Sequence, residues 1–449
     1  TMGAKKLKAI VVKVDKKIRP VPADPVALDS LAKRVSELKI KNWEEYAHDE
    51  AFSIGRPAAC YGCIDGCTRK KYTGENNLKY KVLCQAAVVY IEQVSKYYTK
   101  SSDIYLLATR LCDSYGLDTM VMQPLIRWLS QCYDKGILSD TETGLPLSKI
   151  GSAEFIETLV KQIALREGFG KILARGLVKA SEYVGRGSMR LLNSKIASKV
   201  GELQDYDPRV MLVNALHIAT EPRRPIGLLH GTSYPYIKWL NWNDGYADAG
   251  LTTDILRGIA ETYWGSIEAL DFSTYEGKAL AAKKIQDYSY TKECMTLCDM
   301  IWPIYLIHLR DSTLKPGTLE SRILTAITGR RIDEAEFFEI GERIFNLQRA
   351  ILINQGWEGI EDDILMPYLF DEPIKTVFFS AECMVPGKNG QMTSRKGAVV
   401  DKSEFEKMKN EFYSLRGWDE ASGLQLKSGM NKLGLDDIAE NLEKRSLVK

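Results

Sequence analysis

The stretch EAEFFEIGERIFNLQRAILI, residues 334–353, repeats apolar side chains every three or four positions, which is the period of an amphipathic α-helix. A shorter helix is expected from Asp29 to Leu38, after a run of prolines. The helical period recurs along the rest of the chain, in residues 83–97, 104–115, 120–133, 153–166, 169–183, 254–264, 277–288, 319–328, 405–415 and 435–442. The sequence therefore predicts a mainly α protein.

Extended structure is expected near the N-terminus. Residues 7–14 alternate apolar and polar side chains and predict one β-strand, which Pro20, Pro22 and Pro25 separate from the helices. Residues 225–250 are rich in glycine and aromatic side chains but lack a helical period, so we expect a loop there. The predicted organisation is a strand region at 1–15, a helical domain at 16–225 and a second helical domain at 226–449.

The charge balance excludes several classes of function. Lys and Arg number 61 and Asp and Glu number 59, so the net charge is only +2 and no bulk field attracts nucleic acid or a membrane surface. The apolar fraction of 45% is typical of a folded globular protein. The longest apolar runs are shorter than the roughly 20 residues that span a bilayer. No signal peptide is visible either, so we expect a cytoplasmic protein.

Three of the nine cysteines lie in the stretch CYGCIDGC, residues 60–67. Thiolates are soft metal ligands, and the two glycines allow the backbone to wrap around a metal. Zinc sites usually pair two CxxC units, whereas three close cysteines with a distant fourth are common ligands of a 4Fe-4S cluster. We therefore expect Cys60, Cys63 and Cys67 to bind such a cluster. The spacing leaves the fourth ligand open among Cys84, Cys112, Cys132, Cys294, Cys298 and Cys383.

This cysteine loop resembles the cluster loop of the tungsten-containing aldehyde ferredoxin oxidoreductase family. Other segments resemble that family's motifs in the same order: MGAKKLKAI at 2–10, DSYGLD at 113–118, ELQDYDPR at 202–209 with AT at 219–220, GERIFNLQR at 341–349, and LRGWD at 415–419 with LGL at 433–435. The resemblance implies two helical domains that enclose a tungsten or molybdenum bis-pyranopterin. It also implies that residues 2–10 are the last strand of an N-terminal β domain, which otherwise lies elsewhere on a longer chain or on a separate one.

The first pterin motif of that family, DxxGLD, matches Asp113, Gly116, Leu117 and Asp118. The two carboxylates flank a glycine at the end of a predicted helix, where glycine is a common cap and carboxylates can accept hydrogen bonds from pterin N–H groups. On the residues alone, an ordinary helix cap with solvated carboxylates is the favoured explanation of this pattern. The resemblance implies that the motif binds a pterin.

The second motif of the family, DxxGLC, supplies further pterin contacts and the fourth cluster cysteine. Here residues 293–298 read ECMTLC, so the resemblance implies pterin contacts from Glu293 and Leu297 and makes Cys298 the fourth ligand. Two positions depart from the pattern, because Glu293 replaces aspartate and Thr296 replaces glycine. The glutamate keeps a carboxylate but moves it, and threonine removes a flexible backbone position.

Only four histidines are present, and His217 and His308 lie in apolar helical context that is typical of structural residues. His230 differs because it follows Arg223 and Arg224 in the segment where the family carries a histidine near its metal. As a hypothesis, His230 donates or accepts a proton at the substrate carbonyl.

The resemblance implies oxidation of an aldehyde to a carboxylic acid, with electrons passing through the cluster to ferredoxin or to an iron–sulfur partner subunit. We also expect a homo-oligomer. An alternative is reduction of an aryl-CoA thioester, because residues 80–84 resemble the aryl-CoA reductase branch, in which a cysteine at the position of Cys84 can bind tungsten. A second alternative is a non-catalytic iron–sulfur electron-transfer subunit, which the changes at Glu293 and Thr296 favour. The sequence specifies neither the substrate nor the choice between tungsten and molybdenum.

Overall fold

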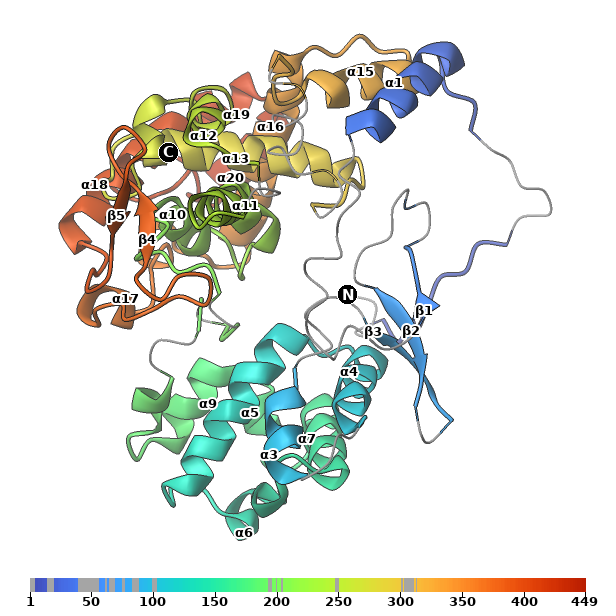
Figure 1. The fold of residues 1–449 in the computed structure, drawn as a ribbon, viewed down its shortest axis with the longest axis vertical. Coiled ribbons are helices and arrows are strands. Elements are labelled where there is room, and N and C mark those ends of the chain that lie inside the picture. Colours follow the sequence, from blue (N-terminus) through green and yellow to red (C-terminus); the bar gives the residue numbers. More distant parts are fainter. Residues whose placement is uncertain are drawn as a thin grey trace.

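The structure is a computed structural model that describes residues 5–13, 20–38, 56–60, 63, 69–74, 77–82, 89–98, 103–192, 196–198, 200–202, 205–246, 250–299, 302, 311 and 313–449. Its helices form two lobes, drawn below and above the centre of Figure 1. The mainly α fold predicted from the sequence is confirmed.

The lower lobe contains a small antiparallel sheet and a group of short helices. The sheet has the order β1-β2-β3, and its third strand packs beside α4. The elements are β1 (Arg56–Pro57), β2 (Lys70–Thr73), β3 (Lys79–Val82), α3 (Ile91–Tyr97), α4 (Ile104–Tyr115), α5 (Thr119–Asp134), α6 (Asp140–Thr143), η3 (Leu147–Lys149), α7 (Ala153–Leu165), α8 (Gly170–Leu173), α9 (Leu177–Val184) and η4 (Ser188–Leu191). Their apolar core runs from Tyr80 to Ile196.

The upper lobe is built around α13 (Lys278–Cys294), which packs against α10, α11, α16 and α18. Its other elements are α10 (Val213–Thr220), α11 (Ile226–Asn243), α12 (Thr253–Ile259), η6 (Ala260–Trp264), η7 (Ile267–Leu270), α15 (Thr318–Thr328), α16 (Glu334–Asn354), η8 (Gly359–Glu361), α17 (Tyr368–Asp371), β4 (Met384–Pro386), β5 (Met392–Ser394), α18 (Lys402–Arg416), α19 (Lys427–Lys432) and α20 (Asp436–Glu443). The N-terminal helix α1 (Pro25–Leu38) lies against α15 (Figure 1).

Each lobe has its own apolar core. The core of the upper lobe runs from Tyr206 to Trp418, so the change from one core to the other falls between Ile196 and Tyr206. The domain boundary expected at 225/226 lies further along the chain and stays a prediction. In the part of the chain that the structure describes, no helix has both the length and the apolar character needed to cross a membrane.

The loop expected at residues 225–250 is wrong, because most of this segment forms α11. The glycines that obscure the helical period serve close packing: a Cβ on Gly231 would lie 2.7 Å from Ile285 Cγ2 of α13. Pro235 cannot donate a hydrogen bond to the carbonyl of Gly231 four residues earlier. That carbonyl instead accepts a hydrogen bond of 3.1 Å from Trp264 Nε1. Tertiary contacts therefore stabilise a helix that the local sequence disfavours.

The strand expected over residues 7–14 is not formed by residues 7–13, which the structure describes. The side chains of Ile10, Val11 and Val12 are 74%, 85% and 83% exposed. A strand exists only when a neighbour completes its hydrogen-bond ladder, and no described segment pairs with this one. The alternating pattern predicts a strand that residues 7–13 do not form, because no described segment pairs with them.

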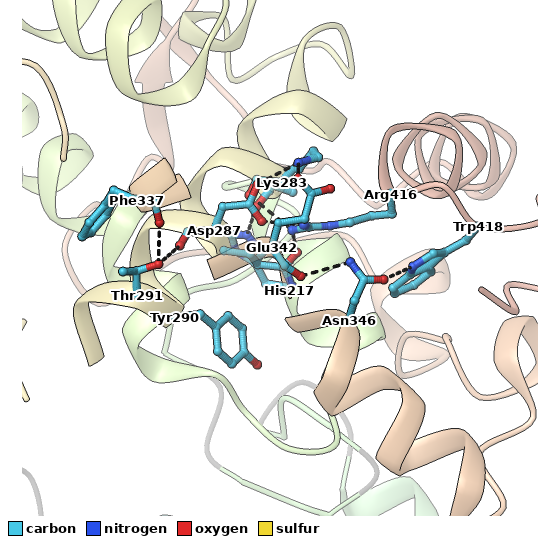
Figure 2. Close-up of polar contacts among 12 residues, drawn as sticks. His217, Lys283, Asp287, Tyr290, Thr291, Phe337, Glu342, Asn346, Arg416 and Trp418 are labelled. Atoms are coloured by element: carbon cyan, nitrogen blue, oxygen red, sulfur yellow. Dashed lines mark hydrogen bonds and ion pairs between the residues drawn. The ribbon is translucent and has the colours of Figure 1, made fainter. Parts of the chain in front are cut away.

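The helix α13 carries polar side chains into the centre of the upper lobe (Figure 2). Asp287 lies 2.5 Å from Arg416 Nη1 of α18 and 2.8 Å from Lys283 Nζ, which in turn lies 2.9 Å from Glu342 of α16. A Cβ on Gly341 would overlap the Asp287 carbonyl, so glycine is needed where α16 crosses α13. We call these five residues the polar seam. It gives the GERIFNLQR stretch a structural role.

Candidate functional site

Two turns of the same shape lie at the ends of α4 and α13. After α4, Gly116 adopts a positive φ of 72° and the N–H of Leu117 donates to the carbonyl of Cys112. After α13, Thr296 adopts a φ of 60° and the N–H of Leu297 donates to the carbonyl of Lys292. Both are helix C-terminal turns that close over a residue in the left-handed conformation, a position at which glycine is favoured. The two sequence motifs, DSYGLD and ECMTLC, therefore occupy equivalent backbone.

The side chains of the first turn divide between packing and polar contacts. Leu117 packs against the lower core, whereas Asp113 is exposed. Asp118 Oδ1 caps α5 by accepting the N–H of Met120 at 2.8 Å, and its other oxygen pairs with Arg223 of the upper lobe. The expected helix cap is confirmed at Gly116. The turn also supplies an exposed and a half-buried carboxylate at a point where the two lobes meet.

The second turn follows the same division. Leu297 packs beside Trp302 in a small apolar cluster, and Glu293 is exposed and lies against Gly227 of α11. Cys298 is exposed, and its carbonyl accepts a 2.8 Å hydrogen bond from the N–H of Trp302. The turn therefore presents a carboxylate and a thiol together.

The loop between α10 and α11, residues 221–225, is held from three directions. Arg224 Nη1 lies 2.9 Å from Asp205 Oδ2, and the Arg224 N–H donates to Glu202 Oε1 at 3.0 Å. Arg223 contacts Asp118 in the lower lobe. Buried Glu221 accepts hydrogen bonds of 2.9 Å from Tyr290, of 2.7 Å from Gln348 and of 3.2 Å from Gln286. This loop connects the polar interior of the upper lobe with the first turn.

His230 lies on α11, one turn after this loop. Its ring stacks on Tyr234 at 4.1 Å between centroids, and the edge of Tyr206 lies 5.6 Å away. Its Nδ1 is 3.4 Å from Asp299 Oδ2. That buried nitrogen has no hydrogen-bond partner among the described residues. Asp299 also contacts Lys292 of α13, so an acid, a base and a cation meet beside Cys298.

Burial shifts the pKa values of these groups. Loss of solvent, with the nearby Lys292 and Arg224 cations, lowers the pKa of His230 to about 3. Burial lowers the pKa of Lys292 to about 8 and raises that of Asp205 above its usual value. The buried Glu221 carboxyl has its pKa raised to about 7. Perturbed groups in one place are typical of functional sites.

A small pocket of about 20 Å³ opens beside His230. Its walls include Gly227, Tyr234, Lys292, Asp299 and Trp302. This space holds about one water-sized group. The pocket therefore admits a small polar atom next to the imidazole.

The expected cluster ligands are only partly described. Cys60 is exposed and Cys63 is half-buried, and the Cys63 N–H donates to the Cys60 carbonyl at 3.1 Å. Cys67 and Cys84 lie outside the described residues, and so does His308. Among the residues that the structure does describe, no three His, Cys, Asp or Glu side chains gather as a metal site. The cluster ligation stays a prediction.

The other described histidine, His217, is fully buried between α10 and α13. Its Nε2 lies 3.2 Å from the Ala282 carbonyl, an environment typical of a structural residue. The sequence reasoning overlooked Lys292, Asp299, Asp205 and Glu221. Asp299 could have been found because it follows Cys298 directly. No sequence motif marks Glu221 or Lys292. They differ from other charged residues only because the fold buries them.

Comparison with known proteins gives a consistent result. Residues 27–435 match the family model described as "Aldehyde ferredoxin oxidoreductase, domains 2 & 3". The chain is 26% identical over 481 residues to the tungsten-containing aldehyde ferredoxin oxidoreductase of Pyrococcus furiosus. The matched region covers 97% of this chain and 68% of that protein. It is 24% identical over 428 residues to the WOR-like subunit of an aliphatic sulfonate oxidoreductase from the same organism, covering 90% and 56%.

A solved structure shares the fold. The active-site complex BamBC of benzoyl coenzyme A reductase, in complex with 1,5-dienoyl-CoA, matches 100% of this chain and 70% of its own with a TM-score of 0.64. The sequence identity is 18%, so this likeness concerns the fold.

Proposed function

The chain belongs to the aldehyde ferredoxin oxidoreductase family, and on that premise we propose that it oxidises an aldehyde to a carboxylic acid. We propose that it holds a tungstopterin and a 4Fe-4S cluster and passes electrons to ferredoxin or to an iron–sulfur partner subunit. The curated relatives are tungsten-containing oxidoreductases, which supports an oxidoreductase of this class. The observation that carries the reaction is His230, a buried imidazole beside the turn that presents Cys298, whose Nδ1 lies 3.4 Å from Asp299 without forming a hydrogen bond.

The described residues fit the proposed cofactors in their chemistry. The exposed carboxylates of Asp113 and Glu293 can accept hydrogen bonds from pterin N–H groups. Arg223 places a cation between the lobes, where it pairs with Asp118. The thiols of Cys60 and Cys298 are accessible for ligation. When bound, the tungstopterin supplies the two-electron redox chemistry and the cluster accepts the electrons one at a time.

The protein's own groups manage protons and orientation. Conversion of an aldehyde and water to a carboxylic acid releases two protons with the two electrons. A neutral, largely buried imidazole can accept one of them, and proton transfer by such a group contributes about 10²- to 10⁴-fold to rate. The ring of His230 is already held between Tyr234 and Tyr206, so its orientation is set before substrate binds.

The test uses the natural, full-length protein purified without oxygen. We expect tungsten with iron and acid-labile sulfide, and aldehyde-dependent reduction of a viologen dye. His230→Gln should lower kcat/KM by about 10²- to 10⁴-fold at unchanged tungsten and iron content. Gly258→Ala on α12 is the matched control, because a Cβ there meets nothing within 4 Å.

Other results would favour the competing functions. Reduction of an aryl-CoA thioester without any aldehyde oxidation would replace this proposal with the aryl-CoA reductase function, to which residues 80–84 and the shared fold point. Iron without tungsten or molybdenum would identify an electron-transfer subunit.

A further inference from the structure

Two charged residues beside His230 have no assigned role. Lys292 lies in the last turn of α13 with its side chain 4% exposed, and Asp299 follows the turn with 18% exposed. They form an ion pair, and the second Asp299 oxygen faces His230 Nδ1 at 3.4 Å. Lys292, Asp299 and His230 therefore make a continuous chain from α13 to α11.

We propose that Lys292 and Asp299 are positioning residues for His230: Lys292 fixes the Asp299 carboxylate 3.4 Å from Nδ1, and a small turn of the ring lets that carboxylate accept the Nδ1–H, which leaves Nε2 free to accept a proton from the reaction. The inference rests on the proposed function, because it states the direction in which His230 moves a proton. In the tautomer with a proton on Nδ1, Nε2 is the only basic nitrogen of the ring. Asp299 thus orients the base through its other nitrogen.

The charges around His230 favour its neutral form. The ring is faced by Lys292, Glu293 and Asp299 from α13 and its turn, and by Arg224 and Asp205 from the segments before α11. Burial and the two cations outweigh the carboxylates and lower the pKa of His230 to about 3. A histidine that is neutral throughout the physiological range is in the form that can accept a proton, whereas a donor requires the charged form.

A missing side chain on α11 makes this approach possible. A Cβ on Gly227 would overlap Glu293 Oε1 and lie 3.0 Å from Asp299 Oδ2. Both contacts involve the ends of flexible carboxylate side chains, so alanine at this position would push the carboxylates aside with little change to the fold. Gly227 lies three residues before His230, so the two residues are neighbours on one face of α11.

The direct test is NMR of the protein labelled with ¹⁵N-histidine, because these 449 residues contain only four histidines and give few signals. Nitrogen shifts report which ring nitrogen carries the proton, and loss of a signal in His230→Gln assigns it. We expect the Nδ1–H tautomer from pH 5 to 8 in the natural protein and in Asp299→Asn, whose amide oxygen still accepts. Asp299→Leu and Gly227→Ala should shift the ring toward Nε2–H, and Gly258→Ala should not.

Lys292→Met tests whether the Lys292 cation keeps His230 in its neutral form. Without its cation the Asp299 carboxylate faces the imidazole unpaired, so the pKa of His230 should rise, and kcat/KM of the holoenzyme should fall severalfold between pH 7 and 5. A merely structural role for Lys292 would lower activity equally at every pH. An Nε2–H tautomer in the natural protein, or one that Gly227→Ala leaves unchanged, would overturn the inference. Absent aldehyde activity would overturn only the proposed function, because the NMR result needs no catalysis.

Discussion

Helices α4 and α13 end in the same turn but are supported differently. The buried side of α4 is mostly apolar, with Tyr105, Leu106 and Cys112 packed into the lower core. The middle of α13 is buried with charged and amide side chains, including Gln286 and Asp287. One turn therefore rests mainly on apolar contacts, which have no preferred direction, whereas the other also rests on ion pairs and hydrogen bonds that fix distance and angle.

Apolar packing mainly stabilises a helix, whereas ion pairs such as those of α13 also fix its position. Apolar packing tolerates small shifts of a helix, whereas a buried ion pair loses most of its energy when its partners move or one is removed. The α13 turn carries Cys298 and the neighbouring Asp299, whose Oδ2 it places 3.4 Å from His230 Nδ1. The polar seam thus places the turn accurately. Sensitivity to pH comes from a different buried group of the upper lobe, Glu221, which bonds to Gln286 of α13.

The largest effect is expected from breaking the seam at Arg416, which is fully buried and lies 2.5 Å from Asp287. Arg416→Met should lower the free energy of unfolding by about 3 kcal/mol, because it leaves a buried carboxylate with Lys283 as its remaining partner. Urea denaturation followed by tryptophan fluorescence measures the change. Arg331→Met, at an exposed position, is the control and should change stability by about 0.5 kcal/mol or less. Equal losses in the two variants would mean that the seam does not support α13.

The second prediction concerns pH and Glu221, which bonds to Gln286 of α13. Its pKa is raised from 4.5 to about 7 by burial. The folded state therefore binds more protons than the unfolded state between these values, and the stabilisation present below pH 4.5 is lost as pH rises through 7. Glu221→Gln removes this titration. Relative to the natural protein, the variant should gain about 3 kcal/mol of stability between pH 4.5 and 8.

Measuring both proteins at each pH isolates Glu221 from other groups. His217, with its pKa lowered to about 4, destabilises the fold as pH falls below 6.5, but it does so in both proteins and cancels in the difference. A difference that stays constant from pH 5 to 8 would show that Glu221 is ionised throughout.

The contrast also explains what the sequence could predict. The helices 104–115, 120–133 and 153–166 were recognised almost to the residue, because an apolar stripe on one face leaves a clear period. The equivalent glycine and threonine turns were located by their motifs. Where packing is apolar and local, the pattern is visible in the chain itself.

Regions that depend on tertiary contacts were not predicted. Residues 226–243 gave no helical period, since Gly231 and Pro235 have their reasons in Ile285 and Trp264, far away in sequence. At the site, His230 was proposed because it follows Arg223 and Arg224 in the segment where the family carries a histidine near its metal, but Lys292 and Asp299 depend on burial and on one close approach at Gly227. No single-sequence pattern contains that information.

The smallest and most specific effects test the two turns directly. Thr296 is β-branched and adopts a φ of 60°, which costs about 1–2 kcal/mol relative to glycine. Thr296→Gly should therefore raise the free energy of unfolding by about 1 kcal/mol, after the greater chain entropy of glycine is deducted. Gly116→Thr at a φ of 72° should lower it by about 1–2 kcal/mol, although a Cβ there meets nothing within 4 Å.

The two substitutions together form the decisive case. The turns lie against different apolar clusters, so their effects should add, and the double variant should lie within about 1 kcal/mol of the natural protein in urea denaturation. Thr296→Gly relieves the backbone strain at the site turn and removes only an exposed side chain, so a loss of activity from a more stable protein would mean that the strained threonine fixes Cys298 and Asp299 in place. Strain of this kind is known at functional sites, where the surrounding structure maintains it. If Gly116→Thr costs nothing, the two turns are alike in shape but not in their demand for glycine, and the equivalence of the two motifs is wrong.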